Sequence, residues 1–455
     1  MENSLQVIND PIVALLGFLA VLVILLFLAA RWKWHIFLSL MIPLLLFGLI
    51  PGVQQTLFMS AFEKGFGTTL GKIGVVIVLG SVIAEFLKHT GSIQVITQSM
   101  VNLVGAKRMP LALTLSGFVL GVAIFSDVAY VILNPLVHAA ARAMGTGIGV
   151  MSIGLVGSIQ LTHAVVPPTP GPLAAAALLG ADIGRTIIYG SLACLVGSLA
   201  SWIWGQYLVG PSLRTLPLDT YSSEHVFKDQ DGIALPGTFR SYAPIVVPVV
   251  LISAQSVSRI FLEEDHLVRR MLEYLGWPVV ALTIGLALAW WNIKSDSGRS
   301  AARIGWVEDG LRVSAMILVV TGLGGSLSAI LKATPAVTVL ASVFASSGLP
   351  AILLPFAIGI LGNMITGSTT VGVITAASLV APMLEGLSLS PEAAVLAGAC
   401  GSVIIKYVNS SYFWVCTSLS GLTVKEAVLG YGGGTLVGGV ASFAVVYVLW
   451  VFGIL

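Results

Sequence analysis

The sequence predicts an all-α polytopic membrane protein built from two inverted-topology repeats. Its 455 residues are 57% apolar and only 9% charged, with a mean hydropathy of +1.00. Soluble proteins carry about 25% charged residues. Apolar runs approaching the roughly 20 residues that cross a bilayer recur along the chain. Ordered sequence matches between the two halves predict the repeat, and interrupted apolar runs predict re-entrant or broken helices.

The first repeat is expected to span residues 1–208, with five transmembrane helices and one re-entrant helical hairpin. The helices are expected at about 12–30, 36–50, 70–88, 148–180 (broken) and 186–208, and the hairpin at 109–143. The first apolar run is preceded by no Lys or Arg, so it is expected to be a retained span rather than a signal peptide. The polar segment 209–241 is expected to be a cytoplasmic linker.

The second repeat is expected to span residues 242–455 with the same elements. Its helices are expected at about 242–257, 274–293, 311–331, 390–420 (broken) and 428–452, and its hairpin at 349–384. Because five spans per unit is an odd number, the second unit must enter the membrane from the opposite face. This count predicts the inversion.

Sequence matches in the same order support the duplication. Leu195–Ser201 matches Leu436–Ser442 at five of seven positions. Shorter pairs recur at nearly the same separation: Glu63-Lys64-Gly65 with Glu308-Asp309-Gly310, Gly80-Ser81 with Gly325-Ser326, Leu120-Gly121 with Leu361-Gly362, and Gly157-Ser158 with Gly401-Ser402. An ordered set of this kind indicates a duplicated unit of membrane segments.

Charge placement predicts the orientation. Most basic residues of the loops fall on one side: Arg31, Lys33, Lys88, Lys107, Arg108, Arg142, Arg214, Lys228, Arg240, Lys294, Arg299 and Arg303. Since basic loops stay cytoplasmic, both termini are expected to face outward, away from the cytoplasm. Arg259, Arg269 and Arg270 oppose this assignment, although acidic residues lie beside them.

Four irregular elements interrupt the apolar runs. The stretch 162–172 contains four prolines within six residues, which cannot remain helical, and the repeat pairs it with 406–412. The hairpins turn near 121–127 and 362–370 without the charges of a solvated loop. Backbone groups freed inside a bilayer need partners in protein, ion, ligand or water. The two tips and two breaks are therefore expected to meet around one cavity near the midplane.

Four motifs at these elements carry a family resemblance. They read Phe125-Ser126-Asp127-Val128-Ala129-Tyr130, His163-Ala164-Val165-Val166-Pro167-Pro168-Thr169-Pro170, Gly367-Ser368-Thr369-Thr370-Val371 and Val408-Asn409-Ser410-Ser411-Tyr412-Phe413-Trp414. Together they resemble the gluconate permease family of proton symporters, along essentially the whole chain. The resemblance implies transport of small hydroxy acids such as gluconate or glycerate, or of D-serine. Asn-Ser-Ser-Tyr replaces the family's frequent Asn-Asp, and Thr169 stands where a His is common.

Asp127, His163 and Lys406 are the ionisable residues placed deepest in the membrane, where a charge costs about 3 kcal/mol or more and usually serves a pathway. Asp127 and His163 are candidates for proton or ion coupling, although each could instead be structural. Lys406 is expected to pair with a substrate carboxylate or with Asp127, or else to extend to the interface. The expected substrate-binding residues are Ser126, His163, Thr169, Gly367, Ser368, Thr369, Lys406, Asn409 and Ser410.

Two other ionisable pairs have plainer interpretations. Glu85 and Lys88 are three residues apart and are expected to form a local ion pair. His138 and Arg142 are four residues apart and are expected to anchor their helix at the membrane interface.

These observations predict a secondary active transporter that couples the transport of a small carboxylate or D-serine to the transport of protons. The first alternative is sodium coupling, and the second is a passive anion channel. No enzymatic activity is expected, since no nucleophile–base motif or metal-binding spacing occurs. No cofactor is expected beyond the coupling ion, H⁺ or alternatively Na⁺. A net charge of +2 argues against nucleic acid, which leaves the lipid bilayer and the substrate as partners. A homodimer is implied by the resemblance alone.

Overall fold

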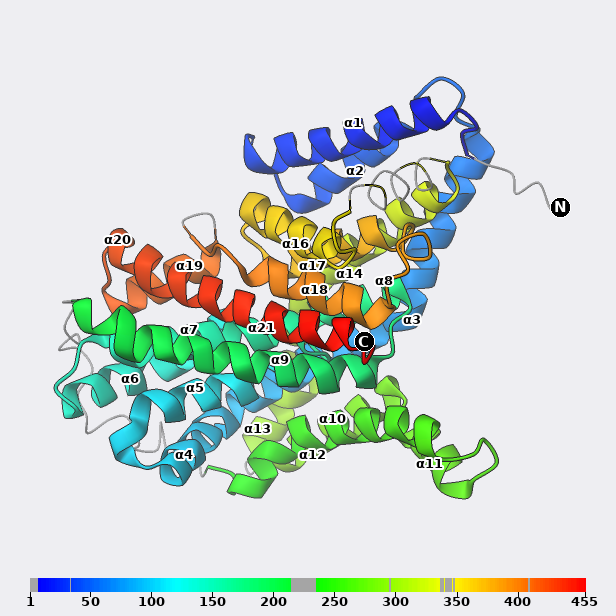
Figure 1. The fold of residues 1–455 in the computed structure, drawn as a ribbon. Helices are drawn as coiled ribbons and strands as arrows, with labels where there is room; N and C mark the ends of the chain where they lie inside the picture. The colour runs from blue at the N-terminus through cyan, green and yellow to red at the C-terminus, as the bar shows by residue number, and fades with distance from the viewer. Residues whose placement is uncertain are drawn as a thin grey trace.

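The computed structural model describes residues 7–455 except 33, 214–234, 294–295, 336–338, 340–345, 347 and 408–409. Throughout these residues the regular secondary structure is helical (Figure 1). Five described helices are long and apolar enough to cross a membrane, or up to seven if each of two bent pairs is one span. The predicted all-α polytopic membrane fold is confirmed.

The first half contains nine α-helices within the described residues. They are α1 (Pro11–Ala30), α2 (Ile36–Phe47), α3 (Gln55–His89), α4 (Ser92–Val104), α5 (Met109–Leu120), α6 (Ser126–Ala143), α7 (Ile148–Val165), α8 (Pro170–Leu179) and α9 (Ile183–Ile203). The predicted hairpin is α5 and α6, and the predicted broken helix is α7 and α8.

The second half follows in a similar order. Its described helices are α10 (Thr238–Phe261), α11 (Leu267–Leu275), α12 (Pro278–Trp291), α13 (Asp296–Ala301), α14 (Val307–Lys332), α16 (Leu353–Thr366), α17 (Thr369–Val380), α18 (Pro391–Val403), α19 (Ser411–Ser420), α20 (Val424–Ala427) and α21 (Gly433–Val451). The predicted hairpin is α16 and α17, and the broken helix is α18 and α19.

Several described elements differ from the expectation. Helix α3 begins well before the predicted 70–88 span, because its first half carries charges and glycines that lower its hydropathy without ending the helix. Helix α4 was not predicted, because only one face of it is apolar and buried, around Ile93, Ile96 and Val101. The predicted linker 209–241 ends inside α10, and its residues 214–234 lie outside the described part of the chain.

The two halves meet through close antiparallel helix pairs. In α3 and α14, Gly65 lies against Gly325 and Gly310 lies against Val82. The Ser326 hydroxyl of this pair donates to a backbone carbonyl of α3 at 2.8 Å. Small residues allow the backbones of membrane helices to approach closely. The antiparallel pairing supports the inversion of the two halves, which stays a prediction.

A second pair, α9 and α21, crosses at the matched motifs of the repeat. Gly197 lies against Gly438 and Ser442, and Gly438 lies against Gly197 and Ser201. Gly197 corresponds to Gly438 in the repeat, and Ser201 corresponds to Ser442. The contact of Gly197 with Ser442 is thus repeated by their counterparts, Gly438 and Ser201, as in two antiparallel helices related by a two-fold axis.

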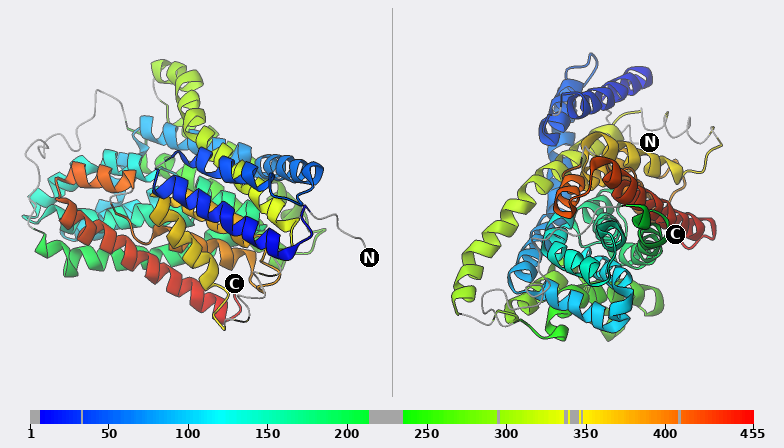
Figure 2. Two further views of the ribbon diagram at one scale, coloured as in Figure 1. Left: turned by 90° about the horizontal axis from the view of Figure 1, so that it is seen from above. Right: turned by 90° about the vertical axis from the view of Figure 1, so that its left-hand side faces the viewer.

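The broken helices form the centre of the molecule. Helices α7 and α18 are buried along almost their whole length, and the end-on view in Figure 2 shows the region of α7 enclosed by other helices. Helices α1 and α2 lie at one edge, and α10, α11 and α12 lie at the opposite edge (Figure 1). These peripheral helices expose large apolar side chains, such as Ile12, Val250 and Phe261, as expected of surfaces that face lipid.

Candidate substrate site between the hairpin tips and the broken helices

A cavity of about 440 Å³ lies among α6, α7, α14, α17 and the unwound segment before α19. Eight of the ten predicted site residues line it: Ser126, Asp127, His163, Gly367, Ser368, Thr369, Lys406 and Ser410. Asn409 lies outside the described residues. The cavity thus brings together one hairpin tip and one break from each half, from positions nearly 300 residues apart.

Three helices begin at the cavity wall. Helix α6 begins at Ser126, α17 begins at Thr369, and Ser410 precedes the first residue of α19. The first N–H groups of a helix have no partner within the helix, and the helix dipole is positive at that end. The Ser368 hydroxyl accepts from one of these groups, the Val371 N–H, at 3.4 Å. The remaining groups favour an anion in the cavity.

Lys406 joins the second tip to the second break. Its side chain is 4% exposed, and its ammonium donates to the Gly367 carbonyl at 2.9 Å and to the Ser410 hydroxyl at 3.2 Å. These contacts leave one of the three ammonium donors for a ligand. The expectation that Lys406 extends to the membrane interface is therefore wrong, because its ammonium is held inside the protein.

Asn363 of α16 positions the unwound segment that carries Lys406. Its side-chain amide donates to the carbonyls of Ile404 and Ile405 at 3.0 and 3.4 Å. The amide thereby supplies partners for backbone groups that lose their helical bonds at the break. Ile405 has a φ of 61°, a left-handed conformation that is unusual for a branched side chain. This turn directs the chain from α18 into the cavity.

Asp127 lies in the first turn of α6, where the helix dipole stabilises a carboxylate. Among the described residues, no basic side chain approaches its carboxylate within ion-pairing distance. The cavity therefore contains one ammonium and one carboxylate that do not pair with each other.

Gln160 is a site residue that the sequence reasoning missed. Its side-chain amide donates to the Thr369 hydroxyl at 2.9 Å, and its side-chain oxygen has no hydrogen-bond partner among the described residues, although Gln160 is only 1% exposed. A buried acceptor of this kind usually binds a ligand or water. The sequence does contain one indication of this role: Gln160 lies three residues before His163, and this spacing places the two side chains on one face of α7. Thr366, Thr370 and Tyr412 also line the cavity without having been singled out.

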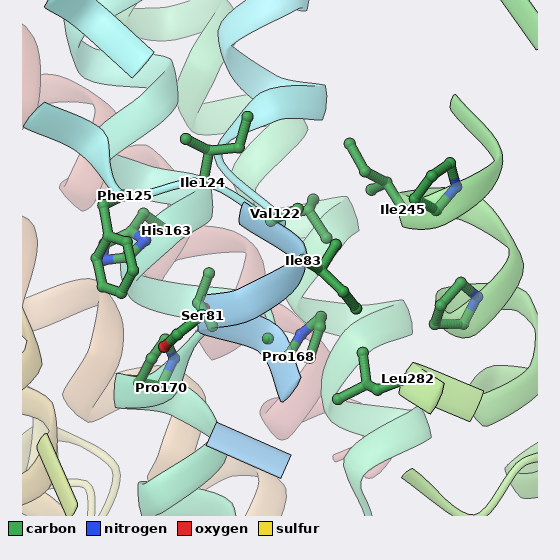
Figure 3. A pocket seen from close by; sticks show the side chains of 15 residues that line it. Ser81, Ile83, Val122, Ile124, Phe125, His163, Pro168, Pro170, Ile245 and Leu282 are labelled. Carbon is green, nitrogen blue, oxygen red and sulfur yellow. The ribbon is translucent and has the colours of Figure 1, made fainter. Parts of the chain in front are cut away.

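Thr169 lies at a smaller pocket beside the first break (Figure 3). Its hydroxyl donates to the Val166 carbonyl at 2.6 Å and so satisfies a backbone group freed by the prolines. His163 and Phe125 line both this pocket and the larger cavity, and their ring centroids lie 5.5 Å apart. Figure 3 shows the two rings side by side, facing an apolar wall that includes Ile83, Val122 and Leu282. The pair forms the partition between the two spaces.

The sequence profile described as GntP family permease matches residues 13–452. The chain belongs to the GntP permease family. This GntP-family protein is accordingly a membrane permease and not an enzyme, and the resemblance drawn from its motifs is confirmed.

Curated relatives of this GntP-family permease carry related names. It is 29% identical to the high-affinity gluconate transporter of Escherichia coli K12, over 89% of this chain and 92% of the relative. It is 28% identical to the D-serine transporter DsdX of the same organism, over 92% and 94%. It is 30% identical to an uncharacterized permease of Haemophilus influenzae, over 97% and 93%.

Two solved structures share the fold of this GntP-family permease. MtrF of Neisseria gonorrhoeae superposes with a TM-score of 0.61 at 15% identity, over 87% of this chain and 84% of MtrF. The YdaH transporter of Alcanivorax borkumensis superposes with a TM-score of 0.58 at 14% identity, over 86% and 88%. At these identities the likeness shows the fold alone.

Proposed function

We propose that this permease is a secondary active transporter that couples substrate uptake to protons across the bacterial inner membrane. Its proposed substrate is a small hydroxy acid or sugar acid, of the gluconate or glycerate type, or D-serine. The gluconate and D-serine transporters among its relatives support this substrate class. The observation that carries the proposal is the cavity that Lys406 and Asp127 both line, between the tips and the breaks, without pairing with each other.

The substrate carboxylate is proposed to bind between the Lys406 ammonium and the N-terminus of α17. Thr369 and Ser368 present hydroxyls beside that helix end, and a charged hydrogen bond is worth about 1.5–3 kcal/mol. Gln160, Ser126 and Ser410 are then placed to contact the substrate's hydroxyl or amino groups. About 440 Å³ falls within the range of small-molecule sites.

Asp127 is proposed to carry the coupling proton. An anionic substrate and an ionised Asp127 would repel each other inside one weakly polar cavity. A proton on Asp127 removes this repulsion, so the proton and the substrate favour each other's binding, and the coupling is reciprocal. His163, at the partition between the cavity and the smaller pocket, is the second candidate for this role.

Sodium coupling is the main alternative, because the Asp127 carboxylate, the Ser126 hydroxyl and nearby carbonyls offer the oxygen ligands that a hard cation prefers. A passive anion channel is the second alternative, and it predicts flux without accumulation.

Uptake into proteoliposomes distinguishes these functions. The purified protein is reconstituted, and radiolabelled gluconate, glycerate and D-serine are offered under an inward proton gradient in sodium-free buffer. We expect accumulation above the external concentration, and its loss when a protonophore is added. Accumulation that requires sodium and ignores the protonophore would support the sodium alternative, whereas equilibration without accumulation would support a channel.

We also propose a homodimer with both termini in the periplasm. The resemblance implies a homodimer, which a mass measurement of the detergent-solubilised protein checks.

A further inference from the structure

Helix α6 carries a row of polar side chains that begins at the substrate cavity and continues beyond it. Asp127, Tyr130, Asn134, His138 and Arg142 follow one another at intervals of three or four residues, which places them on one face of the helix. We call these five residues the α6 seam. At 1.5 Å per residue the seam extends about 22 Å. It begins at the cavity and ends beside the exposed residues 143–145.

Tyr130 begins the buried part of the seam, one turn beyond Asp127. Its hydroxyl lies 2.5 Å from the Ser420 hydroxyl and 3.3 Å from the Tyr431 hydroxyl. Ser420 and Tyr431 are themselves 2.5 Å apart, and Tyr431 donates to the Ser152 hydroxyl at 2.9 Å. All four residues are buried. Each hydroxyl both donates and accepts, so this cluster can receive a proton at one oxygen and release another.

Asn134 lies one turn beyond Tyr130 and is 1% exposed. Neither its side-chain oxygen nor its side-chain nitrogen has a hydrogen-bond partner among the described residues. An unpaired buried polar group costs about 1–3 kcal/mol, and buried water commonly satisfies such groups. The amide therefore points to water between Tyr130 and the next turn of the seam.

His138 continues the seam toward the surface. It is fully buried, and its Nε2 lies 2.9 Å from the Leu419 carbonyl. The expectation that His138 anchors α6 at the membrane interface is therefore wrong, because α19 packs over it. Arg142 follows on the last turn of α6 and is partly exposed.

We propose that the α6 seam is a proton path that connects Asp127 with the aqueous side at Arg142, separately from the route of the substrate. The proposal rests on the proton coupling proposed above. A proton leaves the Asp127 carboxyl and each hydroxyl or water on the path accepts one proton and passes on another. Water at the end of α6 takes up the last proton, and Asp127 becomes a carboxylate.

The groups that face the seam suit this role. The ionisable residues beside it on neighbouring elements are Lys406, Tyr412, Cys416 and Tyr431. None of these four residues is a carboxylate. Among these described residues, Asp127 is therefore the one carboxylate, and it lies where the seam meets the cavity. Hydroxyls, an amide and an imidazole can pass protons, and Tyr130, Asn134 and His138 of the seam are buried.

The test separates proton movement from substrate movement. Tyr130→Phe removes one hydroxyl of the path, and Asn134→Leu removes the polar contact for water at similar volume. Tyr242→Phe and Asn292→Leu are matched controls, since Tyr242 hydrogen-bonds Ser99 at 2.7 Å and Asn292 bonds a backbone carbonyl at 2.9 Å, both away from the seam. Each variant is reconstituted and assayed for gluconate counterflow, which needs no net proton release, and for gluconate-driven proton uptake.

We expect both seam variants to retain counterflow within about twofold and to lose proton uptake at least tenfold, while the two controls retain both activities. Unchanged proton uptake in Tyr130→Phe and Asn134→Leu would overturn the path. Equal loss of counterflow and proton uptake would also overturn it, because it would assign the seam a structural role. If the unmodified protein moves gluconate without protons, the proposed coupling itself fails, which is a distinct result.

Discussion

Lys406 and Asp127 line one cavity without pairing, because the Lys406 ammonium donates to the Gly367 carbonyl at 2.9 Å and to the Ser410 hydroxyl at 3.2 Å. A direct ion pair would neutralise both groups and leave no net attraction for a substrate anion. Holding them apart lets the ammonium serve the substrate and the carboxylate serve the coupling ion.

Replacing the ammonium tests the first of these roles. We expect Lys406→Met, which keeps the apolar stem and removes the charge, to raise the Kd for gluconate roughly 10- to 100-fold, since a charged hydrogen bond contributes about 1.5–3 kcal/mol. Ligand-dependent thermal shifts of the purified variant measure the affinity. Unchanged affinity together with loss of folded protein would assign Lys406 a structural role.

Replacing the Asp127 carboxylate tests its role in binding the coupling ion. Asp127→Asn keeps the size of the side chain but cannot release a proton. We expect it to abolish accumulation driven by a proton gradient while preserving part of the counterflow. Asp309→Asn, at an exposed carboxylate in the first turn of α14 that does not line the cavity, serves as the comparison and should retain accumulation. Full accumulation by Asp127→Asn would contradict its role as proton carrier.

The crossing of α9 and α21 should tolerate no side chain at Gly197. A Cβ there would lie 2.5 Å from the Gly438 carbonyl, and such overpacking costs about 1–3 kcal/mol. We expect Gly197→Ala to lower the Tm of the detergent-solubilised protein. Gly71→Ala is the matched control, because no described atom lies within 4 Å of its added Cβ and alanine favours a helix by about 0.5–1 kcal/mol. Equal Tm values for the two variants would argue against this packing.

The orientation of the chain can be checked by cysteine labelling. Cys194, Cys400 and Cys416 are all buried, so they provide a low background for a membrane-impermeant maleimide. We expect single cysteines added before Met1 or after Leu455 to react from the periplasmic side of intact spheroplasts. Labelling of only one terminus would contradict the even number of crossings that the two repeats imply.

The sequence predicted the interrupted helices well because their chemistry is local. Pro167, Pro168 and Pro170 end α7 wherever the segment is placed, and the break observed between Val165 and Pro170 follows directly. The hairpin tips were similarly marked by small residues inside long apolar runs. The local pattern alone therefore predicts that the residues at these breaks share one site.

What the sequence could not give are contacts that depend on packing. Gln160 faces the cavity only because α17 brings Thr369 to its amide, and Thr169 turns to the Val166 carbonyl instead. The sequence did not predict helix α4, because a 13-residue amphipathic segment carries too few apolar residues to indicate a membrane span. These features follow from the tertiary arrangement, not from residue type.

The mutual contact of Gly197 with Ser442 and of Gly438 with Ser201 is self-complementary. Such an isologous surface would equally join two separate half-length chains inserted in opposite orientations. Gene duplication and fusion of a dimer-forming ancestor would then have required no new interface at this crossing, only a connection between the end of one copy and the start of the next.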